Sequence, residues 1–506
     1  PNIIRKLGHL ERYQSAQHLL RAYLACAVSC RYAMPDALLA TGPSSPILEA
    51  IVERAFAQAI LEHPLFQVGL ANEDSKKPSW VRLDRIDLHN HIEWRTVADT
   101  EDYDDVLREV LDWQVNHRFT HLETLPRWRS VILKSASFHS VDIVFAWDHA
   151  AGDGMSGKIF HQSLLTALNA GSDEKYSEPL KDRSFDVLLT ALPPPVEKLL
   201  KLPVSCGFLL TEGWHTLRPP SLALDFPYAV KWAPVQPSPC TTRLSLVVVT
   251  EEILQGVLVA CRQHQTTLTG LLHTLILVSM ATRLPEDKVQ AFQTGTPLCL
   301  RRFISPSPEE YPDLNMEHTV GMAVTYWHYR FDKDIVTKVR QLANSDSSRA
   351  DSDGDLGATV WSAATALKQE LSKKLESIPK NDAVGLTRFV GDWRSFVEDR
   401  AKTPRETSWE LSNLGVIDGE VQKEKEKSGA GENWTIERAV YSQSASVSGP
   451  AICMNPVAVK GKGLVITCVW QVEVIEDQLV RGLSSDLETW LNGLGEKGRL
   501  TFDVHR

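Results

Sequence analysis

The chain has 506 residues, 43% of them hydrophobic and 23% charged, and a formal net charge of −10 at pH 7. These values are ordinary for a globular protein, and the length suffices for two or three domain-sized cores. The negative charge argues against a nucleic-acid-binding protein, which needs a basic face to neutralise phosphates. No stretch of sequence is apolar for long enough to cross a bilayer, and residues 1–6 lack the apolar core of a signal peptide.

The eight cysteines are spread through apolar segments, and none of them forms a CxxC pair with another. They are Cys26, Cys30, Cys206, Cys240, Cys261, Cys299, Cys453 and Cys468. This spacing is typical of buried free thiols in a reducing compartment. We therefore expect a cytoplasmic protein.

The first half of the chain alternates between helical and strand-like patterns. In chain order these predict a helix from residue 9, a strand beginning at 25–28, a helix at 46–63, two short strands within 80–94, a helix at 102–113, strands at 128–135 and 140–147, and a helix at 155–168. The helix at 46–63 has apolar residues at three- and four-residue steps. It ends before Pro64 because a residue that precedes proline disfavours the helical conformation. The strands at 128–135 and 140–147 form a predicted hairpin.

A proline-rich segment separates this half from the next. Prolines recur between positions 193 and 239 too often for a continuous helix or a central strand. Beyond it, the patterns predict strands at 244–249, 294–304 and 320–331, a helix that opens at 250–252, helices at 268–282, 333–343 and 358–378, strands at 438–447, 451–459 and 463–473, and a last helix at 475–494. We therefore predict two mixed halves, 1–185 and 241–506, joined by a crossover at 186–240.

Residues 141–154 (VDIVFAWDHAAGDG) combine a strand-like run with a glycine-rich turn. Residues two apart on a strand share a face. The residues expected to project together are Ile143, Phe145, Trp147 and His149. A histidine is the usual general base near neutral pH, because its unperturbed pKa lies close to the working pH. On pattern alone, a buried histidine bonded to a backbone carbonyl is an equally good interpretation.

Asp153 follows His149 by four positions and lies between two glycines. Gly152 and Gly154 allow the backbone to turn sharply, so Asp153 can fold back beneath the imidazole or form an ion pair. Asp153 also precedes the helix predicted at 155–168. An aspartate at that position caps free amides and favours the positive end of the helix. The two roles are compatible.

The segment 149–154 (HAAGDG) matches the HxxxDG signature of the chloramphenicol-acetyltransferase-like acyltransferase superfamily, and other segments resemble landmarks of its fungal alcohol O-acetyltransferase family. In chain order they are 5–13 (RKLGHLERY), 63–65 (HPL), 125–129 (LPRWR), 192–194 (LPP), 297–302 (PLCLRR) and 411–415 (LSNLG). The resemblance covers essentially the whole chain. Asp148 stands where condensation domains carry a second histidine, and the DFGWG motif of the plant enzymes is absent. Both departures favour the fungal family.

This resemblance implies an α/β (α+β) fold of two chloramphenicol-acetyltransferase-like subdomains, with mixed sheets flanked by helices and a tunnel at their interface. Acyl-CoA, most simply acetyl-CoA, enters as co-substrate from one side. A small alcohol or a fungal secondary metabolite enters from the other. His149 is then the general base for direct transfer to the acceptor hydroxyl, and Gly154 allows close approach of the backbone to the thioester.

The resemblance also assigns supporting residues. Asp153 becomes a structural residue that pairs with an arginine of the second half. Arg301 is the expected partner, and Arg302 is the alternative because a one-residue slip reverses the facing of a strand. Ser412 and Asn413 are candidate donors to the developing oxyanion. An Asn-Leu-Gly sequence is also an ordinary turn at the end of a strand.

Three other functions remain open from the sequence, one of them a rearrangement in the tunnel that transfers no acyl group. The chain could accept a polyketide or fatty acyl group from an acyl carrier protein, or it could bind a hydrophobic ligand without turnover. A metal site is not expected, because His89 and His91 share a predicted strand face but have no third ligand nearby. Since one chain supplies both halves of the tunnel, we expect a monomer.

Overall fold

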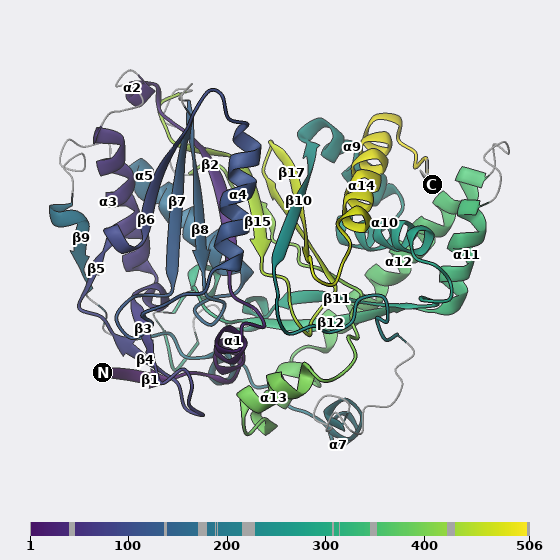
Figure 1. Cartoon of the computed structure of the whole chain (residues 1–506), viewed down its shortest axis with the longest axis horizontal. Helices are drawn as coiled ribbons and strands as arrows, with labels where there is room; N and C mark the ends of the chain where they lie inside the picture. The colour runs from purple at the N-terminus through teal and green to yellow at the C-terminus, as the bar shows by residue number, and fades with distance from the viewer. Residues whose placement is uncertain are drawn as a thin grey trace.

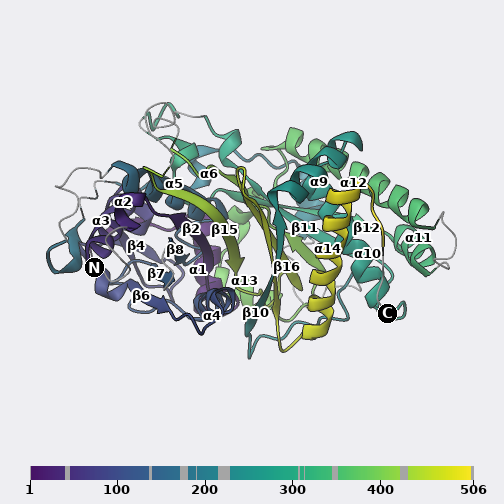
Figure 2. The same ribbon diagram turned by 90° about the horizontal axis from the view of Figure 1, so that it is seen from above.

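The computed structural model describes residues 2–39, 46–135, 139–170, 180–187, 189, 191–214, 228–305, 308–312, 314–344, 352–421 and 431–502. Two halves, each built on a sheet, lie side by side along the long axis of the molecule (Figures 1 and 2). The described termini lie toward opposite ends of this axis in both views. This arrangement confirms the α/β class expected from the sequence.

The first half is built on a five-stranded sheet with the order β15-β2-β8-β7-β6. The strands are β15 (Thr435–Gln443), β2 (Cys26–Ala33), β8 (Ser140–Trp147), β7 (Trp128–Ser135) and β6 (Ile92–Val97). The predicted hairpin is present as the antiparallel pair β7 and β8. Smaller sheets combine β1 (Ile3–Lys6), β4 (Ser79–Arg82) and β3 (Val68–Ala71), and β5 (Arg85–Asp87) with β9 (Ser184–Asp186).

Strand β8 is buried on both faces, which explains why its sequence is almost continuously apolar. Ile143, Phe145 and Trp147 belong to a core that includes residues of α3 (Pro46–Glu62) and α5 (Gly154–Ala170). Val144 and Ala146 belong to a second core, which includes residues of α4 (Tyr103–Asn116) and of the second half. A strand held from both sides is a rigid support for the turn that follows it.

The second half is built on a seven-stranded sheet, with the order β10-β17-β16-β13-β11-β12 and with β14 paired to β16. The strands are β10 (Thr242–Thr250), β17 (Gly463–Gln471), β16 (Ile452–Val459), β13 (Trp409–Leu411), β11 (Phe292–Cys299), β12 (Val324–Phe331) and β14 (Gly415–Ile417). Its helices are α9 (Glu251–Gln263), α10 (Leu268–Arg283), α11 (Lys333–Asn344), α12 (Ser352–Ser377), α13 (Trp393–Arg400) and α14 (Asp477–Lys497). The remaining α-helices of the described residues are α1 (His9–Leu19), α2 (Asp36–Leu39), α6 (Val196–Leu199) and α7 (Cys206–Phe208).

One strand crosses from the second half of the chain into the first sheet. β15 pairs along its length with β2, and Figure 1 shows it at the edge of the first sheet that faces the second sheet. Strand β15 therefore belongs to the sheet of the first half, although most of the second half precedes it in the sequence.

The boundaries predicted for the two halves and the crossover, at residues 185, 186, 240 and 241, stay predictions.

Two sequence predictions were wrong in detail. The strand expected at 294–304 ends at Cys299, and Arg301 lies in a 3-10 helix, Arg301–Phe303. The segment with His89 is also a 3-10 helix, Leu88–Asn90, so His89 and His91 do not share a strand face. In both places a short turn replaces extended backbone.

Two other sequence expectations concern the thiols and the membrane. All eight cysteines are free thiols, five of them buried. Across the described ranges, no helix has the length and apolar character that a membrane span requires.

Candidate functional site

The turn after β8 places His149 at a cavity of about 1040 Å³ between the two halves. The His149 Nδ1 atom lies 3.0 Å from the Gly152 carbonyl oxygen, and Trp147 Nε1 donates to the same oxygen over 2.8 Å. A bond to a carbonyl requires Nδ1 to carry the proton, which leaves Nε2 with a free lone pair. Burial lowers the pKa of His149, so the ring is neutral near pH 7. The ring is therefore prepared to accept a proton.

Asp148, on one side of His149, is held within the first half. Its carboxylate accepts a hydrogen bond from Arg127 and another from the Ala150 amide at 2.7 Å. Arg127 also pairs with Glu73 at 3.1 Å, and Glu73 lies 2.8 Å from His18 Nδ1. His18, Arg127 and Asp148 are buried, the Glu73 side chain is 8% exposed, and all four lie within one half of the chain. Asp148 thus fixes the start of the turn.

Asp153, on the other side of His149, joins the two halves. Its Oδ2 atom accepts from Arg301 Nη1 at 2.6 Å and from the Ala323 amide at 3.0 Å. Its Oδ1 atom accepts from the Ser156 amide and hydroxyl at 3.2 and 3.1 Å. Asp153 therefore caps α5 and forms a buried ion pair with the second half at the same time.

The surroundings of Arg301 distinguish it from Arg302. Arg301 is buried, and it also donates to the Thr319 and Gly321 carbonyl oxygens at 3.1 and 2.8 Å. Arg302 is exposed, and its guanidinium lies over the Phe303 ring. Of the two expected partners, Arg301 is the one that Asp153 contacts.

Gly154 and Ser412 lie near a tyrosine that sequence reasoning missed. Tyr441, on β15, is buried and hydrogen-bonded to Ser412. A Cβ atom on Gly154 would lie 2.8 Å from the Tyr441 hydroxyl oxygen. Gly154 is therefore required for the close approach of this ring, and all three residues line the cavity.

Asn413 lies elsewhere. Its side chain is exposed, donates to Thr269 Oγ1 over 3.2 Å and accepts from the Gly415 amide over 2.8 Å. Gly415 has a φ of 78°, a left-handed conformation that favours glycine. This is the strand-end turn that the sequence left open, and Asn413 is not among the residues that line the cavity.

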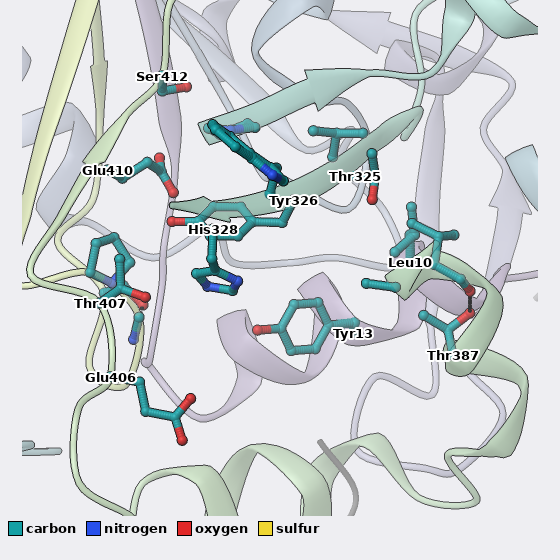
Figure 3. A pocket seen from close by; sticks show the side chains of 18 of the residues that line it. Leu10, Tyr13, Thr325, Tyr326, His328, Thr387, Glu406, Thr407, Glu410 and Ser412 are labelled. Carbon is teal, nitrogen blue, oxygen red and sulfur yellow. Dashed lines mark hydrogen bonds between the residues drawn. The ribbon is translucent and has the colours of Figure 1, made fainter. Parts of the chain in front are cut away.

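Several polar residues of the cavity wall could not have been predicted as neighbours from the sequence. Tyr23 packs against His149, with ring centroids 5.3 Å apart. Figure 3 shows Tyr13, Tyr326, His328 and Glu410 directed into the same space. They come from segments far apart in the sequence, so only the folded chain brings them together.

The histidines considered for a metal site are separated by their partners. His89 is exposed and bonds to Asp87, whereas His91 is buried and bonds to the Trp128 carbonyl oxygen. Within the part of the chain that the structure describes, no group of three or more His, Cys, Asp or Glu side chains could hold a metal ion.

The chain is similar to known proteins along nearly its whole length. The family model described as alcohol acetyltransferase matches residues 87–483. A probable alcohol acetyltransferase, FCK4, of Fusarium pseudograminearum is 30% identical over 99% of this chain and 97% of its own. Another, crmB, of Aspergillus fumigatus is 24% identical over 93% and 95%. The structure of the TRI3 trichothecene 15-O-acetyltransferase of Fusarium sporotrichioides superposes with a TM-score of 0.70 at 14% identity, covering 98% of this chain and 95% of that one.

Proposed function

The chain belongs to the alcohol acetyltransferase family, and from that premise we propose that His149 is the general base of its reaction. The family expected from the HxxxDG segment is thereby confirmed. The chain is an O-acyltransferase that uses an acyl-CoA co-substrate and an alcohol acceptor. The observation that carries the role of His149 is its hydrogen bond to Gly152, which leaves Nε2 unprotonated at the cavity.

The proposed transfer is direct. Nε2 of His149 removes the proton of the acceptor hydroxyl as that oxygen attacks the thioester carbonyl carbon. The new carbon–oxygen bond forms, the carbon–sulfur bond breaks, and the proton passes from Nε2 to the departing sulfur. The products are the ester and free CoA. General-base catalysis of this kind contributes about 10²–10⁴-fold to the rate.

Ser412 and Tyr441 are proposed to stabilise the negative charge that develops on the carbonyl oxygen. Their hydroxyls are hydrogen-bonded to each other beside Gly154, and both line the cavity. A hydroxyl already held by a partner reorganises little during the reaction. Ser412→Ala should lower kcat by up to about 10²–10³-fold. Asn413→Ala, which alters only the neighbouring turn, is the matched control.

The test of the base is release of free CoA by the variant His149→Ala. We expect turnover to fall by about 10²–10⁴-fold while the melting temperature stays near that of the unmodified enzyme. His117→Ala, which removes an exposed histidine stacked on Trp113, should leave turnover unchanged. Near-normal turnover by His149→Ala would remove it from the mechanism.

The identity of the acyl donor and the class of the acceptor are also proposals. We take acetyl-CoA as the donor, with a small alcohol or a fungal secondary metabolite as the acceptor. The support is the fungal origin of the similar acetyltransferases and the trichothecene acceptor in the name of one of them. A comparison of acetyl-CoA with an acyl group on a carrier protein tests the donor, because only one of them should support rapid ester formation.

A further inference from the structure

Four polar side chains form a connected cluster on the cavity wall, and we call them the carboxyl cluster. They are Tyr23, Tyr326 on β12, Glu410 on β13 and Gln443 on β15. Only 8% of Glu410 and 5% of Gln443 are exposed, so these polar groups lie in the interior and face the cavity. The proposed reaction, which needs only His149, Ser412 and Tyr441, does not use them.

Hydrogen bonds fix the orientation of the cluster. The Tyr23 hydroxyl donates to Gln443 Oε1 at 2.8 Å, and Gln443 Nε2 donates to Glu410 Oε1 at 3.0 Å and to Asn455 Oδ1 at 2.9 Å. Both hydrogens of the Gln443 amide are used in this way. Gln443 therefore holds the Glu410 carboxyl in one position through one of its two oxygens.

A glycine allows Tyr326 to reach the same carboxyl. Gly295 lies next to Glu410 in the parallel pair of β11 and β13. A Cβ atom on Gly295 would lie only 2.2 Å from the Tyr326 ring carbon that carries the hydroxyl. The tyrosine thus lies across β11 in the space that a side chain would fill, and Figure 3 shows its hydroxyl directed toward Glu410. Three neighbouring strands cooperate to present this carboxyl.

The pKa of Glu410 follows from its surroundings. Burial raises this pKa, and the hydrogen bonds from Gln443 and Tyr326 oppose the shift. In its protonated form a carboxyl can donate a hydrogen bond to an oxygen of a ligand, and in either form it can accept one. The cluster also begins beside the base, because the Tyr23 ring packs against His149. A molecule lying along it would present one group to His149 and another to Glu410.

We propose that the carboxyl cluster binds a second oxygen function of the acceptor (a carbonyl, ether or hydroxyl oxygen) while His149 acts on the hydroxyl that is acetylated. The preferred acceptor is then a polyoxygenated alcohol and not a simple aliphatic one. The volume of the cavity, about 1040 Å³, leaves room for a ring-sized acceptor beside the reacting thioester. This inference rests on the proposed function, since it concerns the acceptor of that reaction.

The test uses three acceptors that share one polycyclic carbon skeleton: a monoalcohol, a diol and a keto-alcohol. Free-CoA release with acetyl-CoA gives kcat and KM for each. The unmodified enzyme should prefer the two oxygenated acceptors by about 10- to 100-fold in kcat/KM, the effect of one well-placed hydrogen bond. Equal kcat/KM for all three acceptors would overturn the inference. Absence of CoA release with every acceptor would instead contradict the proposed function.

Variants of the carboxyl cluster test whether it causes the preference for oxygenated acceptors. Glu410→Leu should abolish this preference, because it should raise KM for the oxygenated acceptors and leave KM for acetyl-CoA unchanged. Glu410→Gln should retain most of it, because an amide also donates to an oxygen. Tyr326→Phe should weaken it without unfolding the sheet. Glu212→Gln, which neutralises an exposed carboxylate at the edge of the cavity, is the matched control and should leave the preference intact.

Two results with these variants would contradict the assignment. If Glu410→Leu lowers kcat/KM equally for all three acceptors, the residue has a structural role. If Glu410→Gln loses the preference as fully as Glu410→Leu, the group is an ionised acceptor and does not donate to the substrate. A melting curve for each variant separates both results from loss of the fold, and Tyr326→Phe keeps the inference testable if Glu410→Leu does not fold.

Discussion

Two buried aspartates flank His149, and they hold it in different ways. Asp148 pairs with Arg127, which keeps a second carboxylate partner in Glu73. Asp153 pairs with Arg301, whose other strong contacts are neutral backbone carbonyls. Without Asp148, Arg127 would still have the Glu73 carboxylate, and all three residues lie within the first half. Without Asp153, Arg301 would have no carboxylate partner in the described chain, and this ion pair joins the two halves. Removing each aspartate should therefore lower the stability of the protein by a different amount.

The largest expected effect is that of Asp153→Ala. It leaves a buried guanidinium without an anion, so we expect a loss of about 3–5 kcal/mol in the free energy of unfolding, together with lower activity. Urea unfolding and CoA release measure the two losses. The matched control is Asp486→Ala, which breaks the half-buried Arg283–Asp486 pair inside the second half. It should lower stability but spare the activity of the folded enzyme. Unchanged stability of Asp153→Ala would reduce Asp153 to a helix cap.

A smaller effect is expected for Asp148→Asn. Arg127 keeps Glu73, and the asparagine oxygen can still accept from the Ala150 amide. The loss in unfolding free energy should therefore be about 1–3 kcal/mol. Adding Glu73→Gln removes the spare anion, so the double variant should lose more than the sum of the single losses. A simple sum would mean that Glu73 does not compensate for Asp148.

The two aspartates should also be nearly independent of each other. They share no hydrogen-bond partner in the described chain, so the losses of Asp148→Asn and Asp153→Asn should add to within about 0.5 kcal/mol. A double-mutant cycle in urea measures this coupling. A larger value would show that the turn around His149 transmits strain from one aspartate to the other.

The smallest expected effect is a shift in the pH dependence of kcat/KM. Because only neutral His149 accepts a proton and burial lowers its pKa, the acidic limb of kcat/KM should lie below the ordinary histidine value of 6.5. The carboxylates of Asp153 and, more weakly, Asp148 oppose this shift. Asp148→Asn and Asp153→Asn should each move the acidic limb of kcat/KM to lower pH, and the shift should be larger for Asp153→Asn. A limb above 6.5 would contradict the role of burial.

The sequence predicted most of the elements and the motif, because these depend on neighbours along the chain. The apolar period located α3 and α5, and the polar turn between 135 and 140 located the hairpin of β7 and β8. The sequence did not predict that the strand ends at Cys299 and that Arg301 lies in a 3-10 helix. The path of the backbone after Cys299 depends on contacts with Asp153, which lies almost 150 residues away.

Much of the wall of the cavity could not be predicted. Tyr23, Tyr441 and Gln443 become neighbours only because β15 pairs with β2 across some 400 residues of sequence, and neither strand encodes its partner. Glu410 depends on Gly295 and Tyr326 in two other strands. None of these residues forms a local pattern, so their chemistry emerges only from the pairing of distant strands.

The crossing of β15 has a further consequence, for biosynthesis. While the chain is being made, β2 and β8 can assemble early, but the free edge of β2 has to wait for residues 435–443. An unpaired strand edge is a site for wrong pairing and aggregation. The first half therefore matures only when nearly all of the second has left the ribosome. Truncation before β15 should yield an insoluble product, and we expect no fragment that lacks β15 to be active.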